Sequence, residues 1–285
     1  MTGTTITRAA VIIPASNEAG YIGPCLDALL SRGVGSSCLI VVSANACTDA
    51  TVSIAQSYEI AFHERGDTLV IIDSQIGGKT AALTRAESHL DVIGLGALPR
   101  VYLDADVVCS PHLIDKIVDA LSVDIPRYAT GALVIKRPDS RITRAYARFW
   151  EKLPFVKGGA VGAGFFAVNA AGRARWGRFA DIISDDTYVR LQFAPDERIE
   201  VDASYTWPMV EGFRALVKVR RRQDAGVKEI AHRYPQILVN EQKAPLGLGR
   251  FAMMAATMPF AAMVYVSVHV LTRIGRNKET WTRGR

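Results

Sequence analysis

Short apolar runs alternate with segments of helical periodicity along the first third of the chain. Four of these runs have the length and apolar content of buried strands, at residues 9–14, 38–43, 68–73 and 100–106. Between them, apolar positions recur every three or four residues and predict helices at 18–31, 49–58 and 79–90. This order predicts right-handed crossovers and a mostly parallel central sheet flanked by helices, which is an α/β fold.

Polar residues gather where the predicted strands end. The carboxyl ends of the four strands carry residues 14–18, 43–49, 73–79 and 104–106, and all these segments hold charged or hydrogen-bonding side chains. Because ligands of open parallel sheets bind at the carboxyl ends of the strands, we expect one polar, ligand-binding edge.

The rest of the chain continues the alternation less regularly. We predict a strand at 130–137, a glycine-rich approach to an apolar strand at 158–169, and helices at 141–153, 185–194 and 214–233. We divide the chain into a domain at 1–213, with halves at about 1–107 and 108–213, and a basic helical region at 214–285.

Residues 251–271 carry no formal charge, and these 21 residues are enough to cross a bilayer as a helix. Pro259 would kink such a helix, and both flanks are basic, so the charges give no clear orientation. Three interpretations stay open. They are a transmembrane or re-entrant anchor, an amphipathic helix lying in the membrane surface, and a hydrophobic helix buried against another subunit.

The net charge of +6 is unevenly distributed. Residues 214–250 hold nine Lys and Arg against three acids, and residues 272–285 hold five against one, so residues 1–213 are mildly acidic. The basic end suits nucleotide phosphates or anionic lipid, although a solvated basic face has the same composition. We expect no nucleic-acid partner, because no known binding module accompanies the basic residues.

The four cysteines form no CxxC pair, and no histidines accompany them at zinc-ligand spacing. They are typical of small buried residues in a reducing compartment. The first residues contain only a very short apolar run, broken by Pro14, so we predict no signal peptide. We therefore expect the protein at the cytoplasmic face of the membrane, peripheral or anchored by 251–271.

Asp104 and Asp106 follow the apolar run at 101–103. Residues two apart on a strand face the same side, so both carboxylates can point one way. If the chain turns there instead, one can bind a metal directly and the other through water or a ribose. Two carboxylates suit Mg²⁺ or Mn²⁺, and such an ion would neutralise a diphosphate. The alternative is a solvated turn with two exposed acids.

Lys79 follows two glycines at the start of a predicted helix. Paired glycines let the backbone approach a ligand, and a helix N-terminus favours anions. The spacing does not match a Walker A loop. An ordinary glycine turn with an exposed lysine is the alternative.

Six short motifs occur in a characteristic order: VIIPASNEA (11–19), CTDAT (47–51), GGKTAAL (77–83), YLDAD (102–106), GAGFF (162–166) and DD (185–186). In this order they resemble family 2 glycosyltransferases of the GT-A fold, over about residues 9–223. The resemblance implies a metal-dependent and usually inverting transfer from a nucleotide-diphosphate sugar, with Mn²⁺ or Mg²⁺.

The resemblance also implies roles for the residues that match its motifs. Asp104 and Asp106 match the metal motif, and Asp186 matches the general base of the family's acidic pair. Asp185 is its neighbour in the acceptor site. The remaining donor-site matches are Pro14, Ala15, Glu18, Asn45, Asp49 and Lys79.

Two adjacent carboxylates near a helix start can hold one proton and raise one pKa, which suits a base that takes an acceptor proton. The alternative for Asp185 and Asp186 is a pair that caps a helix, and both roles can coexist.

The chain departs from the family pattern in two places. The segment KVRRRQDAG (218–226) lacks the tryptophan of a QxxRW-type element, which argues against a processive synthase. Arg220, Arg221 or Arg222 could bind the departing diphosphate, and we take Arg222 as the candidate, with a solvated or membrane-facing basic surface as the alternative. The loop around Asn45 lacks the usual aspartates, so the base stays open among UDP, GDP and dTDP, with UDP favoured.

We therefore expect a glycosyltransferase that acts on a lipid-linked or other cell-envelope glycan acceptor. It would meet a membrane surface through 251–285, and a homo-oligomer is possible. A nucleotidyltransferase would open with a glycine-rich basic loop, which the chain lacks. A catalytically silent membrane scaffold on the same fold is the other alternative, and it need not bind a donor with metal.

Overall fold

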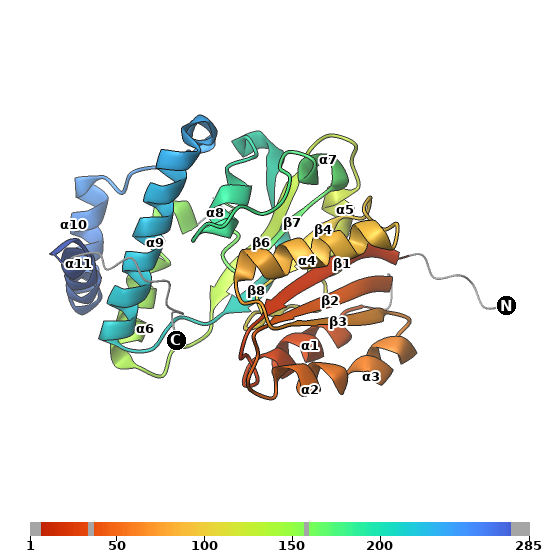
Figure 1. The fold of residues 1–285 in the computed structure, drawn as a ribbon. Helices are drawn as coiled ribbons and strands as arrows, with labels where there is room; N and C mark the ends of the chain where they lie inside the picture. Colours follow the sequence, from red (N-terminus) through yellow and green to blue (C-terminus); the bar gives the residue numbers. More distant parts are fainter. Residues whose placement is uncertain (1–6, 34–36, 157–159, 275–285) are drawn as a thin grey trace.

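The structure is a computed structural model that describes residues 7–33, 37–156 and 160–274, and one eight-stranded sheet forms its centre (Figure 1). The strand order is β3-β2-β1-β4-β7-β6-β8-β5. Their bounds are β1 Thr7–Ala15, β2 Ser37–Asn45, β3 Thr68–Ser74, β4 Arg100–Leu103, β5 Val108–Cys109, β6 Tyr128–Ile135, β7 Phe165–Val168 and β8 Arg198–Trp207. The six predicted strands are confirmed, whereas β5 and β8 were not predicted.

The helices that the structure describes are α1 Ile22–Leu30, α2 Thr51–Gln56, α3 Glu59–Glu64, α4 Lys79–Val92, α5 Leu113–Leu121, α6 Arg141–Trp150, α7 Ala170–Arg173, α8 Asp185–Arg190, α9 Phe213–Arg233, α10 Leu248–Thr257 and α11 Pro259–Ile274. Short 3-10 turns lie at Pro154–Val156, Pro195–Glu197 and Pro235–Asn240. The helix predicted at 18–31 begins only at Ile22, and the one predicted at 49–58 is shorter and is followed by α3.

Strands β3, β2, β1 and β4 pair in parallel, as the sequence predicts. Helices α1, α2 and α3 lie on one side of this part of the sheet and α4 lies on the other (Figure 1). Val11 and Ile13 of β1 join the core on the first side, and Ala10 and Ile12 join the core under α4. All four residues are fully buried, as expected for a strand that is covered on both faces.

Strand β7 runs antiparallel to both of its neighbours, β4 and β6. Its pairing with β4 ends at Leu103, opposite Phe165. The amide of Asp104 then donates to the carbonyl of Gly164 at 2.8 Å, and the amide of Val107 donates to the carbonyl of Asp104 at 3.0 Å. The prediction that the strand continues through residue 106 is therefore wrong, because the chain turns as soon as the ladder ends.

Gly164 lets the chain pass close to this turn. Its φ is +73°, and a Cβ there would lie 3.0 Å from the side chains of both Val107 and Trp207. A side chain at this position would therefore push the turn and β8 apart. It would also strain the backbone, because residues other than glycine rarely adopt this φ.

A buried polar cluster joins α4 to β4. The carboxylate of Glu87 accepts a hydrogen bond from the Tyr102 hydroxyl at 2.6 Å and pairs with Arg100 at 3.3 Å and Arg173 at 3.1 Å. Glu87 and Arg100 are 5% and 2% exposed, so the charges compensate one another away from water. The cluster fixes the relative position of Lys79, which begins α4, and Asp104, which follows β4.

The C-terminal helices form a layer at one end of the sheet (Figure 1). Helix α11 packs against α6 and α9, with Ala262, Val264 and Val268 buried. The apolar segment predicted at 251–271 is broken between α10 and α11 at Pro259, which cannot donate a backbone hydrogen bond. Within the described ranges, none of the helices combines the length and apolar character needed to cross a bilayer.

The opposite side of these helices stays apolar. Phe260, Met263 and Ile274 are 54%, 57% and 72% exposed. The segment therefore forms two helices that pack against the rest of the chain and expose an apolar outer face. Its role as a membrane anchor, a membrane-surface helix or a subunit interface stays a prediction. The basic tail predicted at 272–285 lies outside the described residues from 275 onward, as do Gly158 and Gly159 of the glycine-rich segment.

Candidate active site

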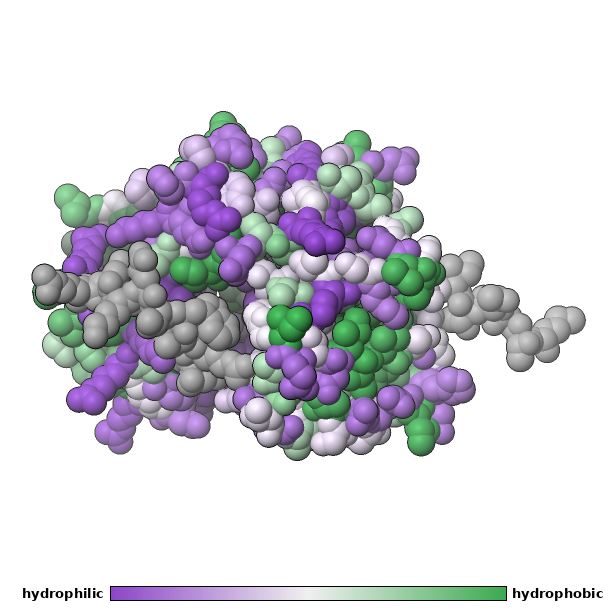
Figure 2. Space-filling model, in the orientation of Figure 1, coloured by the Kyte–Doolittle hydropathy of each residue, from purple (hydrophilic) through white to green (hydrophobic). Residues whose placement is uncertain are grey.

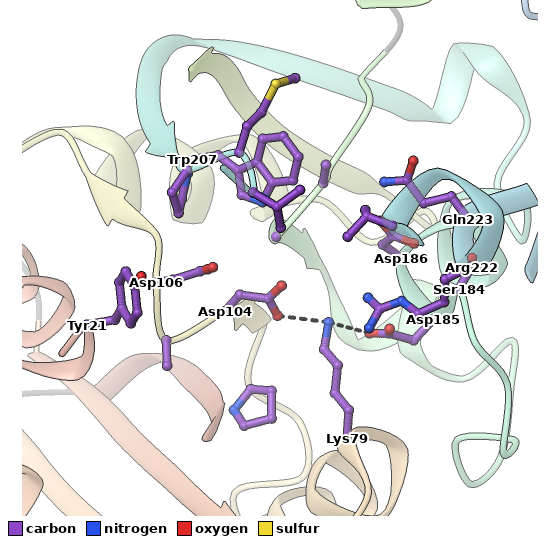
Figure 3. A pocket seen from close by; sticks show the side chains of 18 of the residues that line it. Tyr21, Lys79, Asp104, Asp106, Ser184, Asp185, Asp186, Trp207, Arg222 and Gln223 are labelled. Atoms are coloured by element: carbon purple, nitrogen blue, oxygen red, sulfur yellow. Dashed lines mark ion pairs between the residues drawn. The ribbon is translucent and has the colours of Figure 1, made fainter. Parts of the chain in front are cut away.

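A cavity of about 510 Å³ lies at the polar edge of the sheet (Figure 3). Its walls come from the loop after β1, the start of α4, the turn after β4, the start of α8, the end of β8 and one side of α9. Most predicted site residues line it, namely Pro14, Glu18, Asn45, Lys79, Asp104, Asp106, Asp185, Asp186 and Arg222. Ala15 and Asp49 are not among its lining residues.

Lys79 lies between two carboxylates that come from different elements (Figure 3). Its Nζ is 2.8 Å from Oδ1 of Asp104 and 3.1 Å from Oδ2 of Asp185. Burial disfavours the ammonium, but Asp104, Asp185 and Asp186 together hold the pKa of Lys79 above its usual value. The lysine is therefore a fixed cation at the start of α4, and its two ion pairs connect the turn after β4 to α8.

Asp104 and Asp106 diverge at the turn. Asp104 points toward Lys79, whereas Asp106 lies on the side of Tyr21 (Figure 3). Of the two arrangements that the sequence left open, the shared strand face is wrong and the turn is correct, because both acids lie beyond the end of β4. Both still line the same cavity, which is the arrangement in which one acid contacts a metal directly and the other acts through water or a ribose.

The two acids suit a hard divalent ion that is completed by its substrate. Across the described residues, there is no cluster of three or more His, Cys, Asp or Glu that could hold a metal alone. Mg²⁺ and similar ions are commonly bound by one or two carboxylates together with substrate phosphates. Asp104 and Asp106 therefore fit a Mn²⁺ or Mg²⁺ ion that arrives with a diphosphate.

Asp185 and Asp186 begin α8 but face different surroundings. Asp185 is 5% exposed and pairs with Lys79, so it lies in the part of the cavity that Asp104 also faces. Asp186 is partly exposed, and its Oδ1 accepts a hydrogen bond from the amide of Thr187 at 2.6 Å. It lines both this cavity and a neighbouring one, which makes it the acid best placed between two substrates.

Burial raises the pKa of Asp185 from 3.8 to about 6, with Asp186 and Asp104 adding to the shift and Lys79 opposing it. The folded protein thus holds this proton more tightly than the unfolded chain. The resulting stabilisation is complete below about pH 4 and is lost as the pH rises through about 6. Asp185→Asn removes this loss, so at pH 7.5 it should be more stable than the wild type by on the order of 2 kcal/mol.

Thermal unfolding of both proteins between pH 4 and 7.5 measures this difference, which should shrink toward zero at the acid end. Asp181→Asn, at an exposed position outside both cavities, serves as the control and should follow the wild type. If Asp185→Asn is instead less stable at pH 7.5, the ion pair with Lys79 outweighs the cost of burying the charge.

Asn45 and Asp49 connect the loops at this edge of the sheet through hydrogen bonds. The amide group of Asn45 donates to the carbonyl of Ala15 at 2.8 Å and accepts from the amide of Gly78 at 3.0 Å. Asp49 accepts hydrogen bonds from the hydroxyl of Thr51 and from the amides of Thr51 at 3.0 Å and Ala19 at 3.1 Å. Burial alone would raise the pKa of Asp49, but these bonds hold it below its usual value. Both side chains are thus engaged within the protein.

Helix α9 separates the roles of its three consecutive arginines. Arg220 pairs with Asp224 at 2.7 Å, and Arg221 donates to the carbonyl of Leu271 at 2.8 Å. Arg220 and Arg222 both line the cavity, and Arg222 lies near Asp185 (Figure 3). Because Arg220 is already paired with Asp224, Arg222 is the better candidate for the predicted contact with a departing diphosphate.

The sequence prediction missed the aromatic side chains of the cavity. Tyr21 follows the first loop, Trp150 ends α6, and Trp207 ends β8. A signal for Trp207 was present, because residues 198–207 alternate apolar and polar positions as a strand does. Nothing in the sequence indicates that Trp150 lines a cavity, because residues 141–153 have the periodicity of an ordinary amphipathic helix.

Comparison with known proteins agrees with this geometry. The model of the family described as "Glycosyl transferase family 2" matches residues 10–181. No protein of curated function matches the chain.

Solved structures share the fold at low sequence identity. The mannosyltransferase PcManGT from Pyrobaculum calidifontis, in complex with GDP-Man and Mn²⁺, aligns with a TM-score of 0.58 and 19% identity over 96% of this chain and 78% of that one. S. aureus TarS 1-349 in complex with UDP aligns with a TM-score of 0.50 and 9% identity over 98% and 95% of the two chains. These similarities show a GT-A-type fold.

Proposed function

The chain belongs to glycosyl transferase family 2, and from its site we propose that it transfers a sugar from a nucleotide-diphosphate donor in a metal-dependent, inverting reaction. One observation carries the proposal. Lys79, Asp104, Asp106 and Asp186 come from three separate segments, the start of α4, the turn after β4 and the start of α8, and line one cavity at the carboxyl edge of the sheet. The complex of the similar mannosyltransferase with GDP-Man and Mn²⁺ supports a donor and ion of this kind.

The donor would lie with its diphosphate between the turn after β4 and the start of α4. Asp104 and Asp106 would hold Mn²⁺ or Mg²⁺, and the ion would supply charge neutralisation for the leaving diphosphate. Lys79 and Arg222 add two cations from the protein beside the same place. Such fixed charges stabilise the negative charge that develops when the sugar–phosphate bond breaks.

The acceptor would approach from the side of Asp186. In an inverting transfer, the acceptor hydroxyl attacks the anomeric carbon opposite the diphosphate, and its proton passes to a base. Asp186 would take that proton while the bond from the anomeric carbon to the diphosphate oxygen breaks. The products are then the glycoside and a nucleoside diphosphate.

Titration calorimetry of the full chain with UDP-, GDP- and dTDP-sugars, each with and without Mn²⁺, tests this proposal. We expect one nucleotide to bind only in the presence of the ion, and slow ion-dependent donor hydrolysis to accompany it. A chain that binds none of these donors with metal would instead be the catalytically silent scaffold.

We further propose that the acceptor is lipid-linked or part of a cell-envelope glycan, and that the protein acts at the cytoplasmic face of a membrane. The exposed apolar face of α10 and α11 supports this, with Phe260 and Met263 outward and Arg250 and Arg273 nearby in sequence. Figure 2 shows hydrophobic side chains beside strongly hydrophilic ones along the edge that these helices form. Such a mixture is typical of a helix that lies in a membrane surface.

Flotation of the protein with vesicles that contain anionic lipid measures this contact. The wild type should float with the vesicles, and the double variant Phe260→Glu, Met263→Glu should stay in solution. If the wild type does not float, the membrane contact is wrong and the transferase proposal is unaffected.

A further inference from the structure

A second cavity of about 420 Å³ adjoins the first and shares Asp186, Trp150 and Trp207 with it. Lys79, Asp104 and Asp106 line only the first cavity. If the donor occupies the first cavity, as the proposed function requires, the second is the space on the far side of the base. Its volume lies in the range typical of small-molecule sites.

One end of this cavity carries several cations against a single carboxylate. Arg190 and Lys243 both pair with Glu241, at 2.7 Å and 3.2 Å. Arg198 also lines the cavity, and Arg190 is 5% exposed. Burial lowers the pKa of Arg198 to about 10, and the positive charge of Arg190 adds to that effect. Positive charge is therefore crowded here beyond what Glu241 balances.

The other acids of the cavity offset only part of this excess. Asp224 is paired with Arg220 at 2.7 Å. Glu200 also lines the cavity at an exposed position, so Arg190, Arg198 and Lys243 still outnumber the two carboxylates Glu241 and Glu200. Asp186 is ionised when it acts as the base, but it lies one helical turn before Arg190 on α8. The cavity thus has a base at one end and a cationic group at the other.

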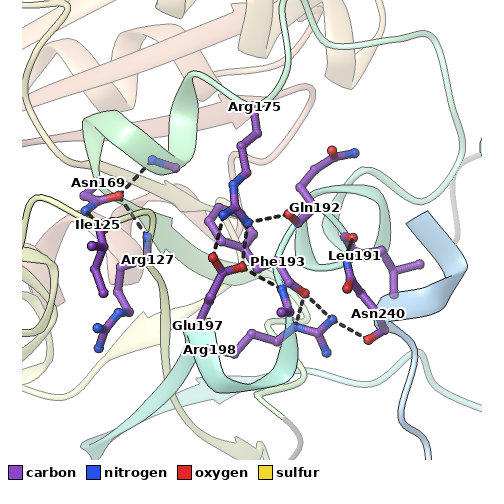
Figure 4. A network of polar contacts seen from close by, with 12 residues as sticks. Ile125, Arg127, Asn169, Arg175, Leu191, Gln192, Phe193, Glu197, Arg198 and Asn240 are labelled. Carbon is purple, nitrogen blue, oxygen red and sulfur yellow. Dashed lines mark hydrogen bonds and ion pairs between the residues drawn. The ribbon is translucent and has the colours of Figure 1, made fainter. Parts of the chain in front are cut away.

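The cationic end is held in place by the backbone around it (Figure 4). Arg198 donates to the carbonyl of Phe193 at 2.6 Å and to that of Asn240 at 2.6 Å. The amide group of Asn240 donates to the carbonyl of Leu191 at 2.8 Å. The segment after α9 is thereby fixed to the end of α8, so Arg190 and Lys243 are positioned before a ligand arrives.

Aromatic rings form another wall. The ring centroid of Trp150 lies 6.3 Å from that of Trp207 and 5.8 Å from that of Phe155. Lys243 lies over the Phe155 ring, 5.6 Å from its centroid. Flat apolar surfaces of this kind can pack against the C–H faces of a sugar ring while its hydroxyls reach polar groups.

We propose that the second cavity binds the acceptor, and that this acceptor is a sugar carrying an anionic group, a phosphate or a carboxylate. The anion would bind Arg190, Arg198 and Lys243, and the hydroxyl to be glycosylated would lie at Asp186. The four-residue step from Asp186 to Arg190 advances a helix by roughly 6 Å. The anionic group therefore belongs on the same ring as the attacked hydroxyl or at the adjacent linkage.

Equilibrium binding and transfer by the full chain, with Mn²⁺ and the donor nucleotide present, test the inference. The probes are hexose phosphates and hexuronates, each paired with the neutral hexose of the same configuration. Polyprenyl-phosphate-linked hexoses in detergent, each paired with an uncharged alkyl hexoside, form a second arm that separates a lipid source of the phosphate from a soluble one. We expect an anionic probe of one arm to bind at least tenfold more tightly than its neutral partner.

Lys243→Met removes one of the cations at a partly exposed position. It should weaken binding of the preferred anionic probe by about tenfold and change binding of the neutral partner little. Lys228→Met makes the same change in charge on the exposed side of α9, outside both cavities, and should behave as the wild type. A purely structural role of Lys243 would weaken both probes equally and would overturn the inference.

The inference is also wrong if no anionic probe of either arm exceeds its neutral partner. Donor hydrolysis without acceptor, measured on the same wild-type protein, separates this failure from that of the proposed function. Hydrolysis without a preference for anionic probes removes the acceptor assignment alone. If the protein shows neither metal-dependent donor binding nor donor hydrolysis, the proposal that it is a glycosyltransferase is itself wrong.

Discussion

Asp186→Asn should lower the rate of transfer by about 10²- to 10⁴-fold, the usual contribution of a general base. The substitution keeps the size of the side chain and removes its ability to accept a proton. Because Lys79 contacts Asp104 and Asp185 instead, the metal and donor should bind as in the wild type. Turnover at saturating donor measures the loss of rate, and calorimetry of nucleotide binding with Mn²⁺ measures whether donor binding is unchanged.

Asp181→Asn is the matched control for this variant. It makes the same substitution five residues earlier, at an exposed position outside both cavities, and should leave turnover unchanged. Full turnover of Asp186→Asn would contradict the assignment of the base. Loss of nucleotide binding in the same variant would move Asp186 from the acceptor side to the donor side.

The donor half of the site could be predicted because its residues follow strands in a regular order. Parallel strands end at one edge, so the segments after residues 13, 43, 73 and 103 had to meet there. Lys79 and Asp104, which lie 25 positions apart in the sequence, contact each other at 2.8 Å for this reason. The order of the motifs then indicated the family, and both the family-model match and the similar solved structures agree with it.

The geometry within the turn after β4 could not be predicted. Whether Asp104 and Asp106 share a strand face depends on where the ladder with β7 ends, and β7 lies some sixty residues later. The sequence carries no local sign of that endpoint. The structure therefore replaces a pair of parallel carboxylates with two acids that enter the cavity from different directions.

The second cavity, which we propose for the acceptor, could not be predicted from the sequence for a similar reason. Its wall combines α6, β8, α9 and the segment at 241–244, which no repeated pattern links. The alternation of residues 198–207 indicates a strand, but nothing in the sequence indicates that this strand pairs with β6. Much of this wall lies beyond residue 181, where the match to the family model ends.

Lys79→Met should change metal binding and catalysis in opposite directions. Nζ of Lys79 lies 2.8 Å from Oδ1 of Asp104, so the ammonium neutralises the charge of this carboxylate. A divalent ion that binds Asp104 must therefore approach a fixed positive charge, which Coulomb repulsion opposes. Removing that charge should tighten the binding of Mn²⁺ in the absence of nucleotide by severalfold, as measured by the paramagnetic signal of free Mn²⁺.

The same variant should lose about 10- to 100-fold in turnover, because a charged contact to the diphosphate contributes about 1.5 to 3 kcal/mol. Lys218→Met, on the exposed side of α9 and outside both cavities, should alter neither quantity. Weaker binding of Mn²⁺ to Lys79→Met would mean that the lysine organises Asp104 for the ion instead of competing with it. The opposite signs matter because misfolding would weaken metal binding and turnover together, whereas competition at Asp104 separates them.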